Sequence, residues 1–420
     1  MTNKLYEKNS YLKEIETVVT ACENRDGQIW ITLADTIFFP EEGGQYADTG
    51  LIKAGDQEVR VLDGAIVRET SDRAESITYK VDATIQPGTA VTCLLDFDTR
   101  YERMQCHSGE HILTGVIHNR YGYDNVGFHL SDDGPITMDI NGQLTYEQVI
   151  EMEAVANKVI YQNLPIIDSY PTKDELKDIS YRSKIEIAGQ VRLITIGEGA
   201  SLVDVCACCA PHVARTGEVG IIKVISVVNW KGGVRISMLA GKRALDYINH
   251  EHDIIRSLTQ TMTTSAENIL SIYNSKLEEI GELKSKLSES LEEGLLSKIK
   301  SELEIEMDND CDSQFVSGTL INPATNAANK AFFAFVDASY PPTSMKNVFN
   351  KMCDMCVGYV GIFSGDDESG YRYFAGSKTL DAKVLGEIFK NELSAKGGGN
   401  SDMIQGQMKV EREDIQDILV

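Results

Sequence analysis

The chain has 420 residues and a formal net charge of −24, with 42% hydrophobic and 25% charged residues. This length predicts two or three domains, and the composition is ordinary for a soluble globular protein. No apolar run approaches the ~20 residues that a membrane-spanning helix needs, and the first ten residues lack the apolar stretch of a secretory signal. We therefore expect a cytoplasmic protein without a membrane partner, whose nine cysteines are reduced or bound to metal.

The negative charge argues against nucleic acid as a partner, because phosphate contacts come from Lys and Arg. Much of the acid lies in residues 278–306 and in the N-terminal third, however, and residues 223–243 are basic enough to form a local patch. The charge alone therefore does not exclude RNA.

Residues 1–95 alternate short apolar runs with turn signals, as in QIWITLAD and SITYKVDA. This alternation predicts a small β-rich domain. The segment 35–50 within it contains Gly43 and Gly44, which allow backbone conformations or close approaches that a side chain forbids. On the glycines alone, a hairpin loop is the simplest interpretation.

Residues 96–250 predict a second, α+β domain. We expect a helix over 100–120, where the apolar and histidine positions form one inward stripe. Strands are expected at VGFHLS and ITMDI, and a helix over 145–163 opens on the Thr-x-x-Gln of a capping box. A strand at VRLITIG, a loop over 202–216 and two paired strands at GIIKVISVV and VRISMLAG complete the pattern.

Residues 251–311 predict a helical connector. The segment 258–299 is typical of a long helix, with apolar residues close to a 3.5-residue repeat. A coiled coil between two copies of the chain and an ordinary long surface helix are the two interpretations. The residues of the repeat are Ile269, Tyr273, Leu277, Ile280, Leu287 and Leu291.

Residues 312–420 predict an α/β module, because the strands AFFAFVDAS, VGYVGIFSG and RYFAGS alternate with two helical segments. Near its end lie Lys396, Gly397, Gly398 and Gly399. A glycine triplet could approach a phosphate or nucleotide backbone closely. A flexible loop is the simpler interpretation.

Two short motifs give the strongest indication of function. His107 and His111 are four residues apart, so on a helix both imidazoles lie on one face. Cys208 and His212 have the same spacing in the loop expected over 202–216. Three nitrogen donors and one thiolate suit zinc, so the sequence predicts one zinc ion per chain.

Three alternatives accompany this interpretation. Cys206 or Cys209 could replace Cys208 as the sulfur donor, although the spacing favours Cys208. HSGEH also fits the His-x-x-Glu-His motif of an inverted zinc peptidase, in which Glu110 is the general base, but nothing marks the third ligand that this enzyme needs. The last alternative is a non-catalytic RNA-binding module with a structural zinc.

These motifs resemble the long form of the freestanding alanyl-tRNA editing proteins, relatives of the editing and DHHA1 domains of alanyl-tRNA synthetase. TIFFPEEGGQYADTG is similar to the family's glycine-rich segment, HSGEHIL to its first zinc motif and CCAPHVARTGEVG to its second. GVRISMLAGKRALDYI resembles the end of the editing domain, and KGGGNSDMIQGQ the glycine-rich end of DHHA1. Tyr46 replaces the usual Pro, and residues 209–211 replace Gly-Gly-Thr, which alters loop shape and not the metal ligands.

The resemblance implies an α+β chain in four parts. These are a β-rich glycine-motif domain (1–95), a zinc-binding editing domain (96–250), a helical connector (251–311) and a DHHA1-like α/β domain (312–420). It also implies hydrolysis of mischarged tRNA(Ala), chiefly the seryl and also the glycyl ester. The expected partner is thus tRNA(Ala) carrying the wrong amino acid, and the connector or the C-terminal domain could join two copies as a homodimer.

Further site residues are expected around the metal ligands. A site built to bond a hydroxyl rejects alanine, which lacks one. Glu110 is expected to hold an imidazole or carry a proton, and a solvent-exposed helix glutamate is the alternative. The full set is Thr36 and Gln45, as partners of a serine hydroxyl; Gly43, Gly44, Gly127 and His129, in the wall around the substrate; Glu110, beside a ligand; and Lys396, Gly397, Gly398 and Gly399, as contacts of RNA.

Overall fold

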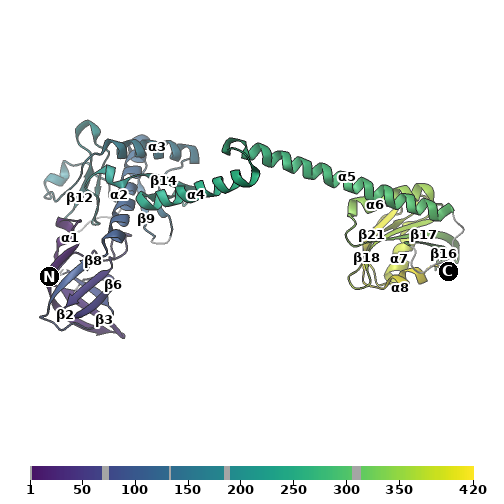
Figure 1. The fold of residues 1–420 in the computed structure, drawn as a ribbon, viewed down its shortest axis with the longest axis horizontal. Coiled ribbons are helices and arrows are strands. Elements are labelled where there is room, and N and C mark those ends of the chain that lie inside the picture. The colour runs from purple at the N-terminus through teal and green to yellow at the C-terminus, as the bar shows by residue number, and fades with distance from the viewer. Residues whose placement is uncertain (1, 69–74, 132–133, 184–189, 305–313) are drawn as a thin grey trace. The chain divides into compact units, whose positions relative to one another are not determined.

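The structure is a computed structural model that describes residues 2–68, 75–131, 134–183, 190–304 and 314–420. The chain divides into two compact units, Met1–Ser257 and Leu258–Val420, and each is described by itself. Helices and strands are mixed and the N-terminal part is β-rich, as predicted (Figure 1). Among the described residues, none of the helices combines the length and the apolar character needed to cross a membrane.

The N-terminal part of the first unit is a closed barrel of six antiparallel strands. Apolar residues alternate along its strands, so every second side chain points into one core. That core contains Ile31, Phe38, Phe39 and Tyr79, all fully buried. In their order around the barrel the strands are β2 (Glu14–Arg25), β3 (Gln28–Leu33), β7 (Glu75–Val81), β6 (Gln57–Arg68), β5 (Gly50–Ala54) and β8 (Ala90–Leu95).

The glycine-rich segment forms a tight turn, which agrees with the hairpin-loop interpretation. β4 (Asp35–Thr36) pairs in parallel with β1 (Asn3–Lys4), which precedes the short α1 (Leu5–Lys8). Glu42 and Gln45 then exchange two backbone hydrogen bonds around Gly43 and Gly44, whose φ angles are 63° and 84°. Two successive positive φ values are those of a type I′ turn, which strongly favours glycine.

The rest of the first unit is built around α2 (Phe97–Tyr121). This helix begins after Asp96, whose side chain accepts a hydrogen bond from the Thr99 backbone, and ends at Gly122 with a φ of 72°. It packs against α3 (Tyr146–Gln162), which begins with the predicted capping box. A four-stranded antiparallel sheet has the order β14 (Ile222–Trp230), β15 (Gly233–Ala240), β10 (Ile136–Ile140) and β9 (Asn125–His129).

The prediction of a loop over the whole of 202–216 is wrong, because part of this segment belongs to a smaller antiparallel sheet. It has the order β11 (Ile166–Ser169), β12 (Leu193–Ile196) and β13 (Asp204–Ala207). The first part of the expected loop is therefore a strand, and Cys208 is the residue directly after it. Two short 3-10 turns, Glu175–Lys177 and Gly199–Ser201, lie between these strands, and a third, Thr216–Val219, lies between β13 and β14.

The predicted continuous helix over 258–299 is wrong. α4 (Gly241–Met262) ends at Met262, Thr263 has a φ of 51°, and α5 (Ile269–Glu304) follows a 3-10 turn over Ala266–Asn268. The interrupted stretch contains several Thr and Ser residues, which have lower helix propensity than the Glu, Lys and Leu that dominate α5.

The second unit is a six-stranded mixed sheet with helices, as the α/β pattern predicts. Its order is β16 (Phe315–Ile321), β17 (Ala328–Val336), β18 (Tyr359–Asp366), β19 (Gly370–Gly376), β21 (Met403–Met408) and β20 (Lys396–Gly399), and only the β17–β18 pair is parallel. α6 (Pro342–Met355), α7 (Ala382–Glu392) and α8 (Arg412–Asp417) complete it. The glycine triplet lies in β20, so the flexible-loop interpretation of Lys396–Gly399 is wrong.

Candidate metal centre

The helix α2 brings two histidines to one buried face. His107 and His111 are one turn apart, and their ring centroids are separated by 5.3 Å. Gly109 lies between them, where a Cβ atom would be 3.0 Å from the Cβ of Ala240. The missing side chain thus allows α2 to approach β15 closely, which buries this turn of the helix.

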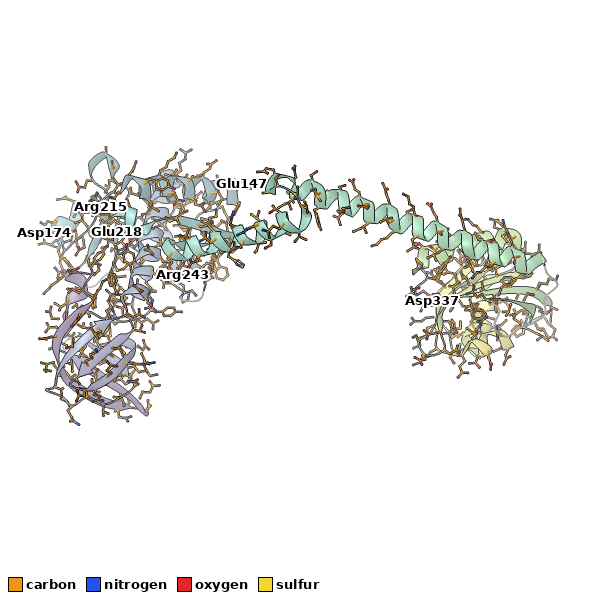
Figure 2. The ribbon with its side chains drawn as sticks, in the orientation of Figure 1. Glu147, Asp174, Arg215, Glu218, Arg243 and Asp337 are labelled. Carbon is orange, nitrogen blue, oxygen red and sulfur yellow. The ribbon has the colours of Figure 1, made fainter. Side chains whose placement is uncertain are left out.

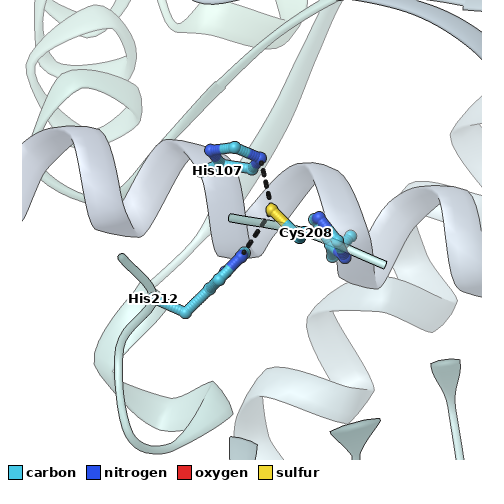
Figure 3. A group of neighbouring side chains, drawn as sticks. His107, Cys208 and His212 are labelled. Atoms are coloured by element: carbon cyan, nitrogen blue, oxygen red, sulfur yellow. Dashed lines mark hydrogen bonds between the residues drawn. The ribbon is translucent and has the colours of Figure 1, made fainter. Parts of the chain in front are cut away.

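The loop after β13 brings a thiol and a third imidazole to the same face. Cys208 Sγ lies 3.6 Å from His107 Nε2 and 3.3 Å from His212 Nε2 (Figure 3). With His111 included, one donor atom from each of the four residues lies within 4.8 Å of every other. Three imidazoles and one thiol therefore converge on a volume the size of a metal ion, with the donor set that zinc prefers.

Each imidazole turns its Nδ1 atom away from this centre to an outer partner. Gln45 Oε1 lies 2.9 Å from His107 Nδ1, Ser108 Oγ lies 3.0 Å from His212 Nδ1, and Asp204 Oδ2 lies 3.4 Å from His111 Nδ1. In His107 and His212 this arrangement leaves Nε2 directed at the Cys208 thiol. Outer partners of this kind fix the tautomer and the ring orientation of metal-binding histidines.

The pKa values of Cys208 and His212 suit metal ligands. Burial raises the pKa of Cys208, but the adjacent His107 and His212 outweigh it and hold that pKa well below its usual value. Burial lowers the pKa of His212 to about 3. A thiolate and a neutral imidazole are the protonation states that bind metal. Burial lowers the pKa of His111, but the adjacent Cys206 and Glu110 outweigh it and raise that pKa well above its usual value.

A buried ion pair supports His111 from behind. Arg182 donates two hydrogen bonds of 2.8 Å to the Asp204 carboxylate and a third of 2.9 Å to Thr114 Oγ1. Burial raises the pKa of Asp204, but the adjacent His111 and the hydrogen bonds from Arg182 reverse the shift and hold that pKa below its usual value. The carboxylate therefore stays ionised against the imidazole. Sequence reasoning missed this pair, although Asp204 shares one face of β13 with Cys206.

The other two cysteines near the cluster are not part of the set of four. Cys206 forms a second buried group with His111 and Asp204. The Cys209 thiol lies on the glycine turn, 3.3 Å from the position of a Cβ on Gly43. The predicted preference for Cys208 over Cys206 and Cys209 agrees with this geometry.

Comparison with known proteins finds relatives that act on or edit alanyl-tRNA, in agreement with the resemblance seen in the sequence. Residues 191–237 match the family described as the threonyl and alanyl tRNA synthetase second additional domain. The whole chain is 26% identical to the alanyl-tRNA editing protein AlaX-L of Pyrococcus horikoshii, of which it covers 97%. The resemblance to the long-form alanyl-tRNA editing proteins is confirmed.

Further relatives cover parts of the chain. The alanine–tRNA ligase of Ignicoccus hospitalis is 31% identical over 69% of this chain, which corresponds to 31% of the ligase. The alanyl-tRNA editing protein Aarsd1-B of Xenopus laevis is 28% identical over 62% of this chain and 64% of its own length. Of these three alignments, the one with AlaX-L covers the whole chain.

Two of the side chains that the editing-protein resemblance singles out lie against the cluster. Gln45 contacts His107, and its Nε2 atom is buried with no hydrogen-bond partner among the described residues. Glu110 is 1% exposed, so the solvent-exposed alternative for this residue is wrong. Its Oε1 accepts a hydrogen bond from Asn125, and its Oε2 lies 3.7 Å from His111 Nε2.

The predicted wall residues lie along the glycine turn and β9. A Cβ on Gly44 would be 2.6 Å from the Phe128 carbonyl oxygen, and the Phe128 ring packs 4.7 Å from the His107 ring. Gly127 lies tightly against Asp139, and the exposed His129 ring packs against the Tyr46 ring. The turn and β9 thus form one surface beside His107.

The remaining predicted residues are placed differently. The Thr36 hydroxyl lies 2.8 Å from the Tyr79 hydroxyl and accepts a hydrogen bond from Phe38 N inside the barrel. Neither of these partners belongs to the metal cluster, and the contact of Thr36 with a substrate stays a prediction. Lys396–Gly399 belong to the second unit, where all four residues are exposed on an edge strand.

Hydrogen bonds from Tyr11, in the N-terminal segment, hold the loop that carries His212. The Tyr11 hydroxyl donates a hydrogen bond of 2.5 Å to Glu218 Oε2 and accepts one of 2.8 Å from Ala214 N. Glu218 Oε1 accepts a hydrogen bond from Arg215 N, and Figure 2 labels both of these residues. The N-terminal segment thereby fixes the loop that presents the third imidazole.

Proposed function

We propose that this chain is a trans-editing hydrolase that removes the wrong amino acid from tRNA(Ala), chiefly serine and also glycine. The observation that carries the proposal is the buried set of His107, His111, Cys208 and His212 in a chain similar over its whole length to an alanyl-tRNA editing protein. The substrate is an aminoacyl ester, whose hydrolysis requires a positioned carbonyl and a water molecule.

The proposal includes one zinc ion per chain, held by these four residues. When bound, zinc supplies Lewis acidity and a fixed anchor for polar groups of the substrate. The donor set supports this choice, because nitrogen and a single thiolate suit a borderline-soft ion. Glu110 is buried next to His111, and in this proposal it holds or moves a proton beside the cluster.

The choice of serine over alanine rests on Gln45 in this proposal. Its carbonyl oxygen is engaged by His107, and its buried amide nitrogen is available to a hydroxyl. A site with a donor reserved for a hydroxyl is left with an unpaired buried group when alanine binds, which penalises alanine strongly. Gly43 and Gly44 leave space for the aminoacyl group beside this amide.

The deciding experiment is serine release from seryl-tRNA(Ala) by the purified full chain, with zinc content measured on the same sample. We expect turnover of the seryl ester and sparing of alanyl-tRNA(Ala). A zinc-loaded protein that binds tRNA without turnover would instead support the RNA-binding module. Cleavage of peptides that survives loss of Cys208 would support the zinc peptidase.

Two further proposals concern the second unit. Lys396 and the glycines of β20 contact tRNA, because an exposed edge strand without bulky side chains presents its backbone to a phosphate chain. Two copies of the chain associate through α5, whose apolar residues Tyr273, Leu277, Ile280 and Leu287 are about half exposed.

A further inference from the structure

Two fully buried charges join the helix α2 to the glycine segment, residues 35–50. Arg100 and Asp48 are each 1% exposed. Arg100 Nε lies 3.0 Å from Asp48 Oδ1 and 2.9 Å from Asp48 Oδ2, and Arg100 Nη2 donates a further hydrogen bond to Oδ2. The same Nη2 atom donates to the Ile37 carbonyl at 2.7 Å. One guanidinium therefore binds the chain on both sides of the glycine turn.

Asp48 also closes the base of this segment. Its backbone nitrogen donates to the Phe39 carbonyl at 2.8 Å, and its Oδ2 atom accepts a hydrogen bond of 2.6 Å from Phe39 N. Arg103, which is 5% exposed, donates to the Ala47 carbonyl at 2.7 Å. The base is thus fixed to α2 at two successive positions, Ala47 and Asp48, which follow closely after Gln45.

The helix that binds the base of the segment also carries His107. Arg100, Arg103 and His107 are spaced by three and four residues, so they lie along one face of α2. Gln45 Oε1 lies 2.9 Å from His107 Nδ1. One short path, from the helix through the two arginines to the base of the turn, therefore determines how Gln45 lies against His107.

The Arg100 guanidinium reaches a third segment as well. Its Nη1 atom donates to the Ser10 carbonyl at 3.3 Å, and the Ser10 hydroxyl donates to the His212 carbonyl at 3.0 Å. Arg100 thereby connects α2, the glycine segment and the N-terminal segment. Each of these segments carries a residue of the metal cluster or contacts one.

The chemistry of the pair favours a positioning role over a purely stabilising one. Much of the attraction between two buried charges is offset by their removal from water, and well-packed apolar residues often replace such a pair without loss of stability. A planar guanidinium, in contrast, holds several acceptors at once in one orientation. The particular contribution of Arg100 and Asp48 is therefore the conformation that they specify, which is that of the glycine turn against α2.

We propose that Arg100 and Asp48 are positioning residues that set the selectivity of the site for serine over alanine. The inference rests on the proposed function, in which the buried amide of Gln45 pairs with the serine hydroxyl. A displacement of about 1 Å in a positioned group can lower a rate by about 100-fold. Arg100 and Asp48 hold the Gln45 amide at its place beside His107, where serine gains a hydrogen bond that alanine lacks.

The first test is Arg100→Lys in the zinc-loaded full chain. Lysine keeps the positive charge but lacks the planar fork that joins Asp48, Ile37 and Ser10. The ratio of kcat/KM for seryl-tRNA(Ala) to kcat/KM for alanyl-tRNA(Ala) should fall by about 10- to 100-fold. Asp48→Asn, which removes the charge that Arg100 binds, should lower the ratio in the same way. Zinc content should equal that of the wild type in both variants.

Arg235→Lys is the matched control. Arg235 binds the Asp139 carboxylate through two hydrogen bonds on the four-stranded sheet, and its guanidinium packs on the Trp230 ring. The same substitution thus breaks the same kind of ion pair in another part of the first unit. The selectivity ratio of this variant should equal that of the wild type.

A milder variant tests the same path without breaking the buried ion pair. Arg103→Met keeps the aliphatic stem and removes the donor to the Ala47 carbonyl, while Arg100 and Asp48 stay in place. Its selectivity ratio should also fall, by less than in Arg100→Lys. If Arg100→Lys and Asp48→Asn do not fold, Arg103→Met decides the question by the same measurements.

A spectroscopic measurement provides a readout besides activity. In the cobalt-substituted full chain, the Nδ1 protons of coordinating imidazoles give paramagnetically shifted NMR signals that exchange with water. The signal that changes in Gln45→Leu identifies His107, because Gln45 Oε1 is the partner of its Nδ1 atom. We expect this proton to exchange several-fold faster in Arg100→Lys and at the wild-type rate in Arg235→Lys.

The outcomes separate this inference from the proposed function. If the wild type releases serine while Arg100→Lys and Arg103→Met match it in selectivity ratio and in proton exchange, the positioning role is wrong and the editing function stands. A lower thermal midpoint with an unchanged ratio would show that the arginines only stabilise the fold, which also overturns the inference. If the zinc-loaded wild type releases no serine from seryl-tRNA(Ala), the proposed function fails, and the inference fails with it.

Discussion

Cys208 is the residue on which the metal centre depends most. Its thiol faces two imidazoles, and no other described cysteine lies within the set of four. We expect Cys208→Ser to lower zinc content from about one per chain toward zero and to abolish serine release, because a hydroxyl is a poor zinc ligand. Metal analysis by mass spectrometry measures the first effect and the deacylation assay the second.

The adjacent cysteine provides the control. Cys209→Ser changes the same loop by the same atom, yet the Cys209 thiol packs on the glycine turn and not on the histidines. This variant should keep its zinc. Equal zinc loss in both variants would mean that the loop, and not the thiolate, determines binding.

Asp204 is predicted to act through His111. Asp204→Asn keeps the size of the side chain and removes the charge that holds the imidazole, so we expect a zinc affinity lower by about 10- to 100-fold. Competition with a chromophoric chelator measures this affinity. Asp139→Asn is the matched control, because Asp139 on β10 forms the same two-bond pair with Arg235 on β15. Unchanged affinity in Asp204→Asn would show that the carboxylate only holds Arg182.

At the level of elements, the glycine turn is expected to be intolerant of any side chain. Gly44→Ala combines a φ of 84° with a Cβ placed 2.6 Å from the Phe128 carbonyl oxygen, so it should destabilise the first unit by about 1–3 kcal/mol and slow serine release. Gly27→Ala has nearly the same φ, 80°, but no atom within 4 Å of the added Cβ. It should cost only about 1 kcal/mol and leave activity unchanged.

Denaturant unfolding of both glycine variants separates the two contributions. The difference between them reports the contact with β9, since the backbone strain is common to both. A Gly44→Ala variant as stable and active as Gly27→Ala would show that β9 moves away easily, and that the turn does not need to sit tightly beside His107.

Local sequence patterns were sufficient to predict the elements that carry the ligands. Helical spacing placed His107 and His111 on one face, and the capping box marked the start of α3. The loop expected over 202–216 concealed β13, although Asp204, Cys206 and Cys208 alternate there as residues of a strand do. Recognised as a strand, that alternation would have indicated the carboxylate behind His111.

The contacts that complete the site depend on tertiary structure. Gln45 and Ser108 reach their imidazoles across 62 and 104 residues of sequence, and no local pattern encodes such a pairing. The break between α4 and α5 was missed for a different reason. The differences in helix propensity that favour it are at most about 0.7 kcal/mol per residue. Such small differences do not outweigh the apolar repeat, which favours a continuous helix.

At the scale of the whole molecule, the apolar residues of α5 are the feature that most needs a partner. The C-terminal part of α5 is covered, since Leu295 and Ile299 pack with α6 in one core. The earlier part carries Tyr273, Ile280 and Leu287 at intervals of seven residues, and all three are exposed. A seven-residue spacing of this kind is that of one coiled-coil seam.

The proposed self-association makes a definite prediction. Ile280→Glu combined with Leu287→Glu should convert a dimer to a monomer in light scattering after size-exclusion chromatography, because two charges would face their copies across the seam. Ser271→Glu adds one charge to the same helix away from that seam and should leave the mass unchanged. A wild type that is monomeric at micromolar concentration would contradict the dimer outright. The exposed stripe would then require another partner, and serine release by that monomer would show that one first unit contains a complete site.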